Sequence, residues 1–304
     1  MSTPVLNRST LIVPLSNEAF IAKAHLRGAD TILLDLEDGV APGAKQAARE
    51  RLPSAVRDVS RGGARVSVRV NRPLGLLVRD LEAAVIPGVS SIGIAKVDGP
   101  GHVRLVSEYI GELEAERGLP AGSVRLSATI ETPQALLQAA DIARADPRLD
   151  SIGMGPLDLA AACGFEPTAE ALMGPMQTLL IAARAAGIHA SGTLGSIANF
   201  RDIEGMRQAL RRSRALGFRG GAAIHPAQVA VLNEAFAPTA EEVAEAREIV
   251  ALARAHFAQG TGAFSYRDRM IDKPVVIAAE KTLELAEAVA ASEARMKRLL
   301  AGQA

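Results

Sequence analysis

Short apolar runs alternate with longer helical segments along the first three quarters of the chain. The runs are rich in β-branched residues, and most are apolar at successive positions, which is typical of parallel strands covered on both faces. They are residues 10–13, 31–34, 66–70, 91–96, 124–130, 151–154, 187–190 and 222–224. Between and after them lie segments rich in Ala, Leu and Arg whose spacing predicts helices: 18–26, 44–56, 78–85, 103–117, 133–145, 170–186, 200–216 and 228–236.

This alternation predicts the α/β fold class, and in particular a (β/α)8 TIM barrel over residues 1–236. Eight strand–helix units in that length match the usual size of such a barrel, roughly 250 residues. An open doubly wound sheet is the alternative, and it typically has a glycine-rich phosphate loop after its first strand. Here Pro14-Leu15-Ser16-Asn17 follows the first run, which favours the barrel.

Residues 237–304 have a different pattern. Thr239 and Glu242 form a capping-box sequence that opens a helix reaching about Gln259. Residues 260–269 are expected to be a loop, and a last helix is expected over 274–300. We expect this C-terminal helical segment to be an arm or lid that contacts a neighbouring subunit; a flap packed on its own barrel is the alternative.

Composition and charge limit the classes of partner. The 34 Lys and Arg residues balance 34 Asp and Glu residues, so no surplus of positive charge is available for a nucleic acid or an anionic membrane. Cys163 is the single cysteine, which excludes an intramolecular disulfide framework and fits a reducing compartment. No apolar run approaches the roughly 18 residues of a membrane span, and no signal-peptide pattern is visible. We expect a cytoplasmic protein.

Charged residues follow most of the predicted strands. In a barrel of this type the chemistry lies at the C-terminal ends of the strands, where eight loops converge. Several charged residues fall there, namely Asp35, Glu37, Asp38, Arg69, Lys96, Glu131 and Asp158. Any one of them could be a loop ion pair or a helix cap, but together they predict a polar mouth able to hold a divalent cation and an anionic substrate.

Two of these carboxylates are the preferred metal ligands. Glu131 and Asp158 follow adjacent predicted strands, and Mg²⁺ typically takes one or two carboxylates together with water and substrate oxygens. The alternative places Glu131 at a helix start, where the helix dipole favours an anion, and makes Asp158 the cap of a short turn. Position alone leaves the two interpretations evenly matched. The five histidines lack metal-ligand spacing, so zinc is not expected.

Several motifs, in order along nearly the whole chain, resemble the HpcH/HpaI aldolase family, in particular its citrate lyase beta subunit-like branch with the malyl-CoA and citramalyl-CoA lyases. The matching segments are Arg8-Ser9-x-Leu11-x-Val13-Pro14, Asp35-Leu36-Glu37-Asp38, Lys45, Arg69-Val70-Asn71, Ile130-Glu131-Thr132, Asp158-Leu159, Ile224-His225-Pro226-x-Gln228 and Met270-Ile271-Asp272. Each segment is weak alone, and the combination is specific.

The resemblance implies a TIM barrel, usually trimeric or hexameric, that makes or breaks carbon–carbon bonds with Mg²⁺. The family's metal-binding residues match Glu131 and Asp158, and its substrate-binding arginine matches Arg69. Lys23 matches a basic position near the CoA portion of the substrate. Asp272 matches an acid that the lyase branch delivers into a neighbouring subunit's site.

The resulting prediction is a lyase acting on a 3-hydroxyacyl-CoA thioester such as malyl-, citramalyl- or citryl-CoA. Arg69 and Lys96 would bind the substrate, with Glu37 and Asp38 orienting these cations or metal-bound water, and Asp272 would move the proton. Asp268 competes with Asp272, because Arg267-Asp268-Arg269 departs from the usual sequence there. The alternatives are a metal-dependent aldolase for free 2-keto acids, a Schiff-base aldolase using Lys96, and a non-catalytic subunit of a larger lyase complex.

Overall fold

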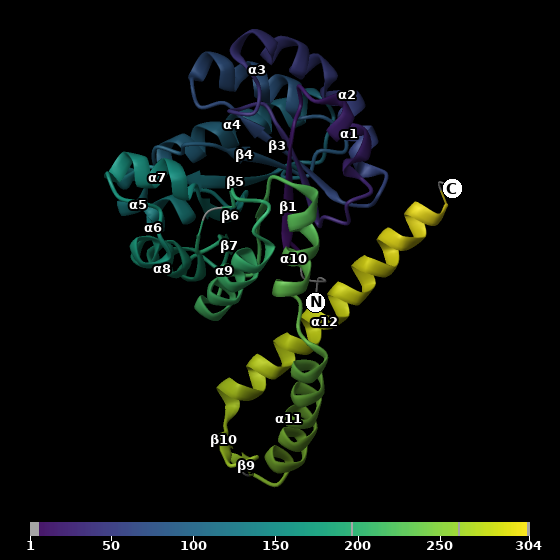
Figure 1. The fold of residues 1–304 in the computed structure, drawn as a ribbon, viewed down its shortest axis with the longest axis vertical. Coiled ribbons are helices and arrows are strands. Elements are labelled where there is room, and N and C mark those ends of the chain that lie inside the picture. The colour runs from purple at the N-terminus through teal and green to yellow at the C-terminus, as the bar shows by residue number, and fades with distance from the viewer. Residues whose placement is uncertain (1–5, 196, 261, 303–304) are drawn as a thin grey trace. The chain divides into compact units, whose positions relative to one another are not determined.

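Eight parallel strands form a nearly closed barrel in the computed structural model, which describes residues 6–195, 197–260 and 262–302 (Figure 1). The strands are β1 (Ser9–Pro14), β2 (Thr31–Asp35), β3 (Arg65–Val70), β4 (Ser91–Ile94), β5 (Arg125–Ile130), β6 (Leu149–Met154), β7 (His189–Ser191) and β8 (Gly221–Ala223). They follow each other in sequence order from β1 to β7, and β8 pairs with β1. Between β7 and β8, the amide of Gly192 donates to the carbonyl of Gly220 at 3.0 Å. The TIM-barrel prediction is confirmed.

Helices follow the strands and surround the barrel (Figure 1). They are α1 (Glu18–Ala24), η1 (Pro42–Ala44), α2 (Lys45–Ser60), α3 (Leu74–Ala84), α4 (Pro100–Glu116), α5 (Pro133–Leu137), α6 (Ala139–Ala143), α7 (Pro156–Cys163), α8 (Ala169–Ala185), α9 (Ile203–Leu216) and α10 (Pro226–Phe236). Asn17 and Thr132 cap their helices as the sequence predicts, each accepting a backbone N–H at 3.1 Å.

Several helices differ from the sequence-based expectation: α3 begins at Leu74 instead of residue 78, and α2 continues to Ser60 instead of ending at residue 56. The helix predicted over 133–145 is two short helices, because the backbone leaves helical geometry at Gln138. The helix expected from residue 200 begins at Ile203, behind the N-cap Asp202. Helix α7 was not expected, although Pro156 stands at its first position, where proline is favoured. This last difference matters because α7 contains Asp158.

The barrel strands have different chemistry on their two faces. On β5, Leu126, Ala128 and Ile130 are buried in the apolar core, while the alternating Ser127 and Thr129 are half-buried and line an interior cavity. Successive strand side chains point to opposite faces, so the apolar set packs under the helices and the hydroxyl set faces the barrel axis. The apolar core that holds the barrel together therefore lies mainly outside the ring of strands.

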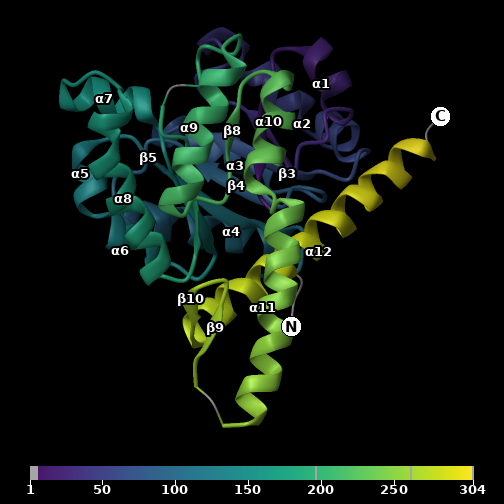
Figure 2. The ribbon, with the colours of Figure 1, turned by 60° about the horizontal axis from the view of Figure 1, so that its bottom comes forward.

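A second compact unit, centred on Ala237–Arg298, follows the unit centred on Asn7–Phe236. It contains α11 (Ala240–Ala258), β9 (Phe264–Tyr266), β10 (Arg269–Ile271) and α12 (Lys273–Ala301) (Figure 2). The capping box of Thr239 and Glu242 is present as predicted. The segment expected as a loop instead contains the antiparallel β9–β10 hairpin, whose turn residues Arg267 and Asp268 have φ of 47° and 59°.

None of the helices in the described part of the chain combines the length and apolar character that crossing a bilayer requires.

Candidate functional site

An arginine–carboxylate pair joins the ends of β2 and β3. The parallel register sets Asp35 opposite Arg69. Arg69 donates from Nε and Nη2 to the two carboxylate oxygens of Asp35, at 2.7 and 2.8 Å. Asp35 is buried and also accepts the amides of Glu37 and Gly39, both at 2.9 Å. A two-point pair of this kind fixes the plane of the guanidinium as well as its position.

Glu37 lies between Arg69 and a second cation. Its Oε2 is 3.4 Å from Arg69 Nη1, and its Oε1 accepts from Lys96 Nζ at 2.5 Å. Lys96 also pairs with Asp38 at 3.0 Å, and its backbone has φ of 48°, an uncommon conformation for a side-chain-bearing residue. Burial alone would lower the pKa of Lys96, but its bonds to Glu37 and Asp38 hold that pKa above the ordinary value. Burial likewise opposes the charge of Arg69, yet Asp35 and Glu37 raise its pKa. Both side chains are therefore cations at neutral pH.

Buried polar groups hold the loop that contains these acids. The Lys45 ammonium donates to the backbone carbonyls of Leu36 and Glu37, at 2.8 and 2.9 Å. Asn71 Nδ2 donates to the same Leu36 carbonyl at 2.9 Å and to Asp80 Oδ2 at 2.6 Å. These bonds satisfy carbonyls that would otherwise be costly to bury. They set the direction in which the Glu37 side chain leaves the loop.

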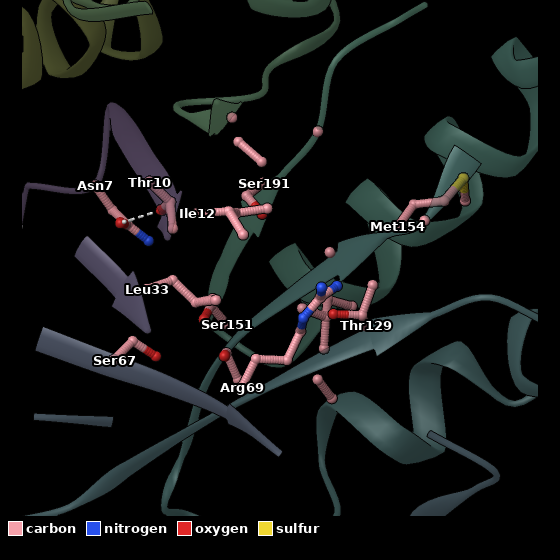
Figure 3. Close-up of a pocket in the computed structure, with 18 of the residues that line it drawn as sticks. Asn7, Thr10, Ile12, Leu33, Ser67, Arg69, Thr129, Ser151, Met154 and Ser191 are labelled. Carbon is pink, nitrogen blue, oxygen red and sulfur yellow. Dashed lines mark hydrogen bonds between the residues drawn. The ribbon is translucent and has the colours of Figure 1, made fainter. Parts of the chain in front are cut away.

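Two carboxylates face the cavity that Arg69 enters. Glu131 follows β5 and Asp158 lies in the first turn of α7, and both line a cavity of about 240 Å³. Arg69 lines the same cavity (Figure 3). Burial of Glu131, reinforced by the charges of Asp158 and Glu37, raises its pKa to about 7. Among the described residues, none donates a hydrogen bond to either carboxylate. The same residues contain no cluster of three or more His, Cys, Asp or Glu side chains suited to a metal. Within the described part of the chain, a cation held here would therefore have at most two such side chains as ligands.

Lys23 lines a second cavity of the barrel unit. This cavity, of about 310 Å³, lies between α1 and the ends of β1 and β8, and Ile12 lines both cavities. Phe20 and Arg27 line it beside Lys23, and Phe20 is largely exposed. His225 lines it too, and its ring is stacked on Phe200 with centroids 4.7 Å apart. The cavity thus offers apolar and aromatic surface beside two cations.

Asp272 and Asp268 both belong to the C-terminal unit. Asp272 follows β10 directly, and its Oδ1 accepts from the amide of Val275 at 3.5 Å near the start of α12. Asp268 forms the hairpin turn. Within the barrel unit, the structure brings together the predicted site residues Arg69, Lys96, Glu37 and Asp38.

Residues 8–226 match the sequence model of the HpcH/HpaI aldolase/citrate lyase family. The chain belongs to the HpcH/HpaI aldolase/citrate lyase family. This family member is 36% identical to citrate lyase subunit beta of Haemophilus influenzae, over 93% of this chain and 97% of that protein. It is 33% identical to L-malyl-CoA/beta-methylmalyl-CoA lyase of Rhodobacter capsulatus, over 93% and 95% of the two chains.

One solved structure is similar to this chain in fold as well as in sequence. Protein CitE from Mycobacterium tuberculosis, in complex with magnesium, acetoacetate and coenzyme A, matches this HpcH/HpaI family chain with a TM-score of 0.72 and 29% sequence identity. The match covers 92% of this chain and 97% of that one.

The structure also shows partners that sequence reasoning missed. Asp35, rather than Glu37 or Asp38, makes the closest bonds to Arg69. The pairing follows from the strand register, in which Asp35 and Arg69 each stand at the fifth position of neighbouring parallel strands. Phe20 and Arg27 were not singled out, since their role beside Lys23 depends on the packing of α1 against the barrel.

Proposed function

We propose that this protein is a Mg²⁺-dependent carbon–carbon lyase that cleaves a 3-hydroxyacyl-CoA thioester into a 2-keto acid and an acyl-CoA. The observation on which this depends is that two carboxylates, Glu131 and Asp158, line one cavity with Arg69. The names of the relatives support it: a citrate lyase subunit, a malyl-CoA lyase and a structure containing magnesium, a keto acid and coenzyme A. The substrate is of the malyl, citramalyl or citryl kind.

The donor set of the cavity fits Mg²⁺. Glu131 and Asp158 are hard oxygen ligands, and their mutual repulsion and the burial of Glu131 favour binding of a cation between them. Two carboxylates leave coordination positions for water and substrate oxygens, as is usual for this ion. When bound there, Mg²⁺ would supply Lewis-acid polarisation of the substrate's hydroxy-carboxylate oxygens.

The residues of the barrel then have distinct roles. During cleavage the hydroxyl proton passes to a carboxylate base, for which we propose Asp272, and the carbon–carbon bond breaks. The electron pair of that bond passes to the acyl-CoA fragment as an enolate, and the enolate carbon takes the proton back. Arg69 binds the thioester oxygen, where negative charge grows in the transition state. Asp35 fixes the guanidinium in advance of binding. Glu37 and Asp38 hold Lys96 as a second substrate-binding cation.

The same contacts argue against a Schiff-base mechanism on Lys96. A nucleophilic lysine needs a lowered pKa, so that the neutral amine is available. Lys96 donates to two carboxylates, and its pKa is raised. Full inhibition by a chelator, with no borohydride trapping of pyruvate on the protein, is the expected result.

The second cavity favours a CoA thioester over a free acid. Its aromatic and apolar wall suits an adenine ring, and Lys23 and Arg27 suit phosphates. Coenzyme A contains both of these groups, and a free keto acid contains neither. Release of glyoxylate, pyruvate or oxaloacetate should therefore be measured across a panel of acyl-CoA thioesters and the matching free acids. The purified chain with Mg²⁺ should cleave at least one thioester and leave the free acids unchanged. Activity on free acids alone would favour the aldolase, and no activity of a folded, Mg²⁺-binding chain would favour the non-catalytic subunit.

Lys23→Ala should raise KM for the thioester by about tenfold, the loss of one charge-assisted contact, while kcat stays near that of the wild type. Lys23 lines the second cavity, whereas Arg69 and Glu131 line the first, so we expect Lys23 to contribute to binding rather than to bond cleavage. Arg104→Ala, which removes an exposed cation of α4, is the matched control and should leave KM unchanged. Steady-state kinetics with varied thioester measure both. An equal loss in kcat would contradict the assignment of this cavity to the CoA portion.

We infer that the arm completes the site of a neighbouring chain in a homotrimer or hexamer, with Asp272 moving the proton. Arg69→Ala and Asp272→Ala proteins should each be inactive. After unfolding and refolding together in equal amounts, random mixing should restore about one quarter of the activity, because some sites then combine an intact barrel with an intact arm of another chain. Asp268→Ala in place of Asp272→Ala tests the competing acid. A mixture that stays inactive, with oligomers of normal size, would refute delivery between subunits.

Gly155→Ala should weaken Mg²⁺ binding through Glu131. A Cβ added at Gly155 would lie 2.7 Å from Glu131 Cγ, so the acid would have to move. Gly43→Ala is the control, since no atom lies within 4 Å of a Cβ there. We expect the Mg²⁺ concentration for half-maximal activity to rise about tenfold in Gly155→Ala, because loss of a contact that positions a metal ligand typically has an effect of this size. The same concentration should stay constant in Gly43→Ala. An unchanged Mg²⁺ requirement in Gly155→Ala would argue against Glu131 as a ligand.

A further inference from the structure

The interior of the barrel is lined by small polar residues. TIM barrels usually fill this space with layers of large branched side chains. Here Ile12 and Leu33 are large and apolar, whereas the neighbouring positions around the ring are serine or glycine (Figure 3). These small residues are Ser67, Gly93, Ser127, Gly153, Ser191 and Gly221. A Cβ added at Gly153 would lie 2.9 Å from Ser191 Oγ, and one added at Gly93 would lie 3.4 Å from Ser127 Oγ, so glycine and serine alternate in space.

Some hydroxyl groups inside this ring have no hydrogen-bond partner among the residues that the structure describes. Ser67, Ser91 and Thr193 line the cavity with only 3%, 6% and 8% of their surface exposed. Within the described residues, Thr193 Oγ1 is buried with no hydrogen bond, and the hydroxyls of Ser67 and Ser91 donate to no protein acceptor. Burial of a hydroxyl without a hydrogen bond costs free energy, so we expect these groups to bind a ligand that can donate and accept hydrogen bonds.

The cavity extends along the full length of the strands. Thr31, Arg65 and Ser91 begin β2, β3 and β4 and line it, and Arg69 and Glu131 line it at the opposite ends of their strands. The four-residue rise from Arg65 to Arg69 corresponds to roughly 13 Å. At the N-terminal end, the Arg65 guanidinium lies 3.8 Å from the carboxylate of Asp150.

We propose that the barrel contains a water-filled shaft, in which ordered water hydrogen-bonds to Ser67, Ser127 and Ser191 and connects the mouth at Arg69 with the N-terminal face at Arg65 and Asp150. Water matches the hydroxyl groups that line this space, because each hydroxyl both donates and accepts, and the cavity of about 240 Å³ is large enough for several waters. The shaft brings solvent to the floor of the site from the side opposite the mouth. This inference does not depend on the proposed reaction.

The experiment compares the wild type with Ser67→Val, Ser127→Val and the double variant. Valine fills space and removes a hydrogen-bonding group at mid-shaft, and Ser54→Val, at an exposed position of α2, is the matched control. Oxygen-17 relaxation dispersion counts long-lived internal waters. We expect the double variant to lose about two or more of these waters, one per filled site, and the control to lose none. A crystal structure of the wild type should show water in contact with Ser67 and Ser127 Oγ.

Urea unfolding provides a second readout, should one variant fold poorly. In a hydrated shaft, Ser127→Val and Ser127→Ala remove contacts to water and should lower the unfolding midpoint or leave it unchanged. In a dry shaft, the same substitutions remove an unsatisfied hydroxyl and should raise the midpoint clearly. An equal count of long-lived waters in the wild type and the double variant, or a raised midpoint in both single variants, would overturn the proposal. An organic molecule in the crystal in place of water would overturn it as well.

Discussion

Glutamine in place of Glu131 should reduce kcat for thioester cleavage by about a thousandfold or more. Lewis-acid stabilisation by a divalent cation contributes several kcal/mol to a transition state, and about 1.4 kcal/mol corresponds to a factor of ten in rate. Glutamine keeps the volume of Glu131 but removes the charge that, with Asp158, would attract the cation. The affinity for Mg²⁺ should therefore fall together with kcat. Asp158→Asn should act in the same direction, since both acids line the same cavity.

Two measurements separate this result from general damage. Isothermal titration with Mg²⁺ measures the affinity directly, and urea unfolding without Mg²⁺ should show a Glu131→Gln protein at least as stable as the wild type, because a buried and repelled charge is removed. Glu108→Gln, at an exposed position of α4, should change neither. Normal Mg²⁺ affinity in both Glu131→Gln and Asp158→Asn would refute the metal site.

Strand-end reasoning predicted that Arg69 and Glu131 stand at the ends of barrel strands, and the positions of those ends have a physical basis. Parallel strands buried on both faces are continuous apolar runs, so their ends can be read from the sequence to within one or two residues. Arg69 and Glu131 stand at such ends, and the barrel then brings them to one cavity. The same reasoning did not assign Asp35 as the partner of Arg69, because that depends on which strand positions face each other.

The elements that were missed lack the usual sequence signals. The β9–β10 hairpin turns through Arg267 and Asp268 in left-handed conformations, where Asn-Gly or Asp-Gly is the usual pair. Helix α7 has eight residues, too short for a clear periodic pattern. The polar interior was also visible in principle, since Leu-Ser-Ala-Thr-Ile on β5 alternates apolar and hydroxyl side chains. That alternation indicates a strand with one polar face, and only the closed barrel turns the polar face inward.

Arg69 and Asp35 offer a test in which activity and stability respond differently. Arg69→Ala should reduce kcat/KM by about a thousandfold, the upper range for loss of one group that stabilises a developing oxyanion. It should also lower the free energy of unfolding by about 3 kcal/mol, since it leaves the buried Asp35 carboxylate without its cation. Arg69→Lys should keep the charge yet lose about a hundredfold in kcat/KM, because one ammonium cannot make two parallel bonds to Asp35 and still present a donor to the substrate.

The double variant Arg69→Ala/Asp35→Asn separates the two roles of the pair. With both charges removed, most of the lost stability should return, because no unpaired buried charge remains, whereas kcat/KM should stay as low as in Arg69→Ala. Urea unfolding measures the stability, and steady-state kinetics measure kcat/KM, of the wild type, Arg69→Ala, Arg69→Lys and the double variant. Recovery of activity together with stability would mean that Arg69 acts only by neutralising Asp35. The substrate oxygen would then have to be held by another group, such as Lys96, which is linked to Arg69 through Glu37.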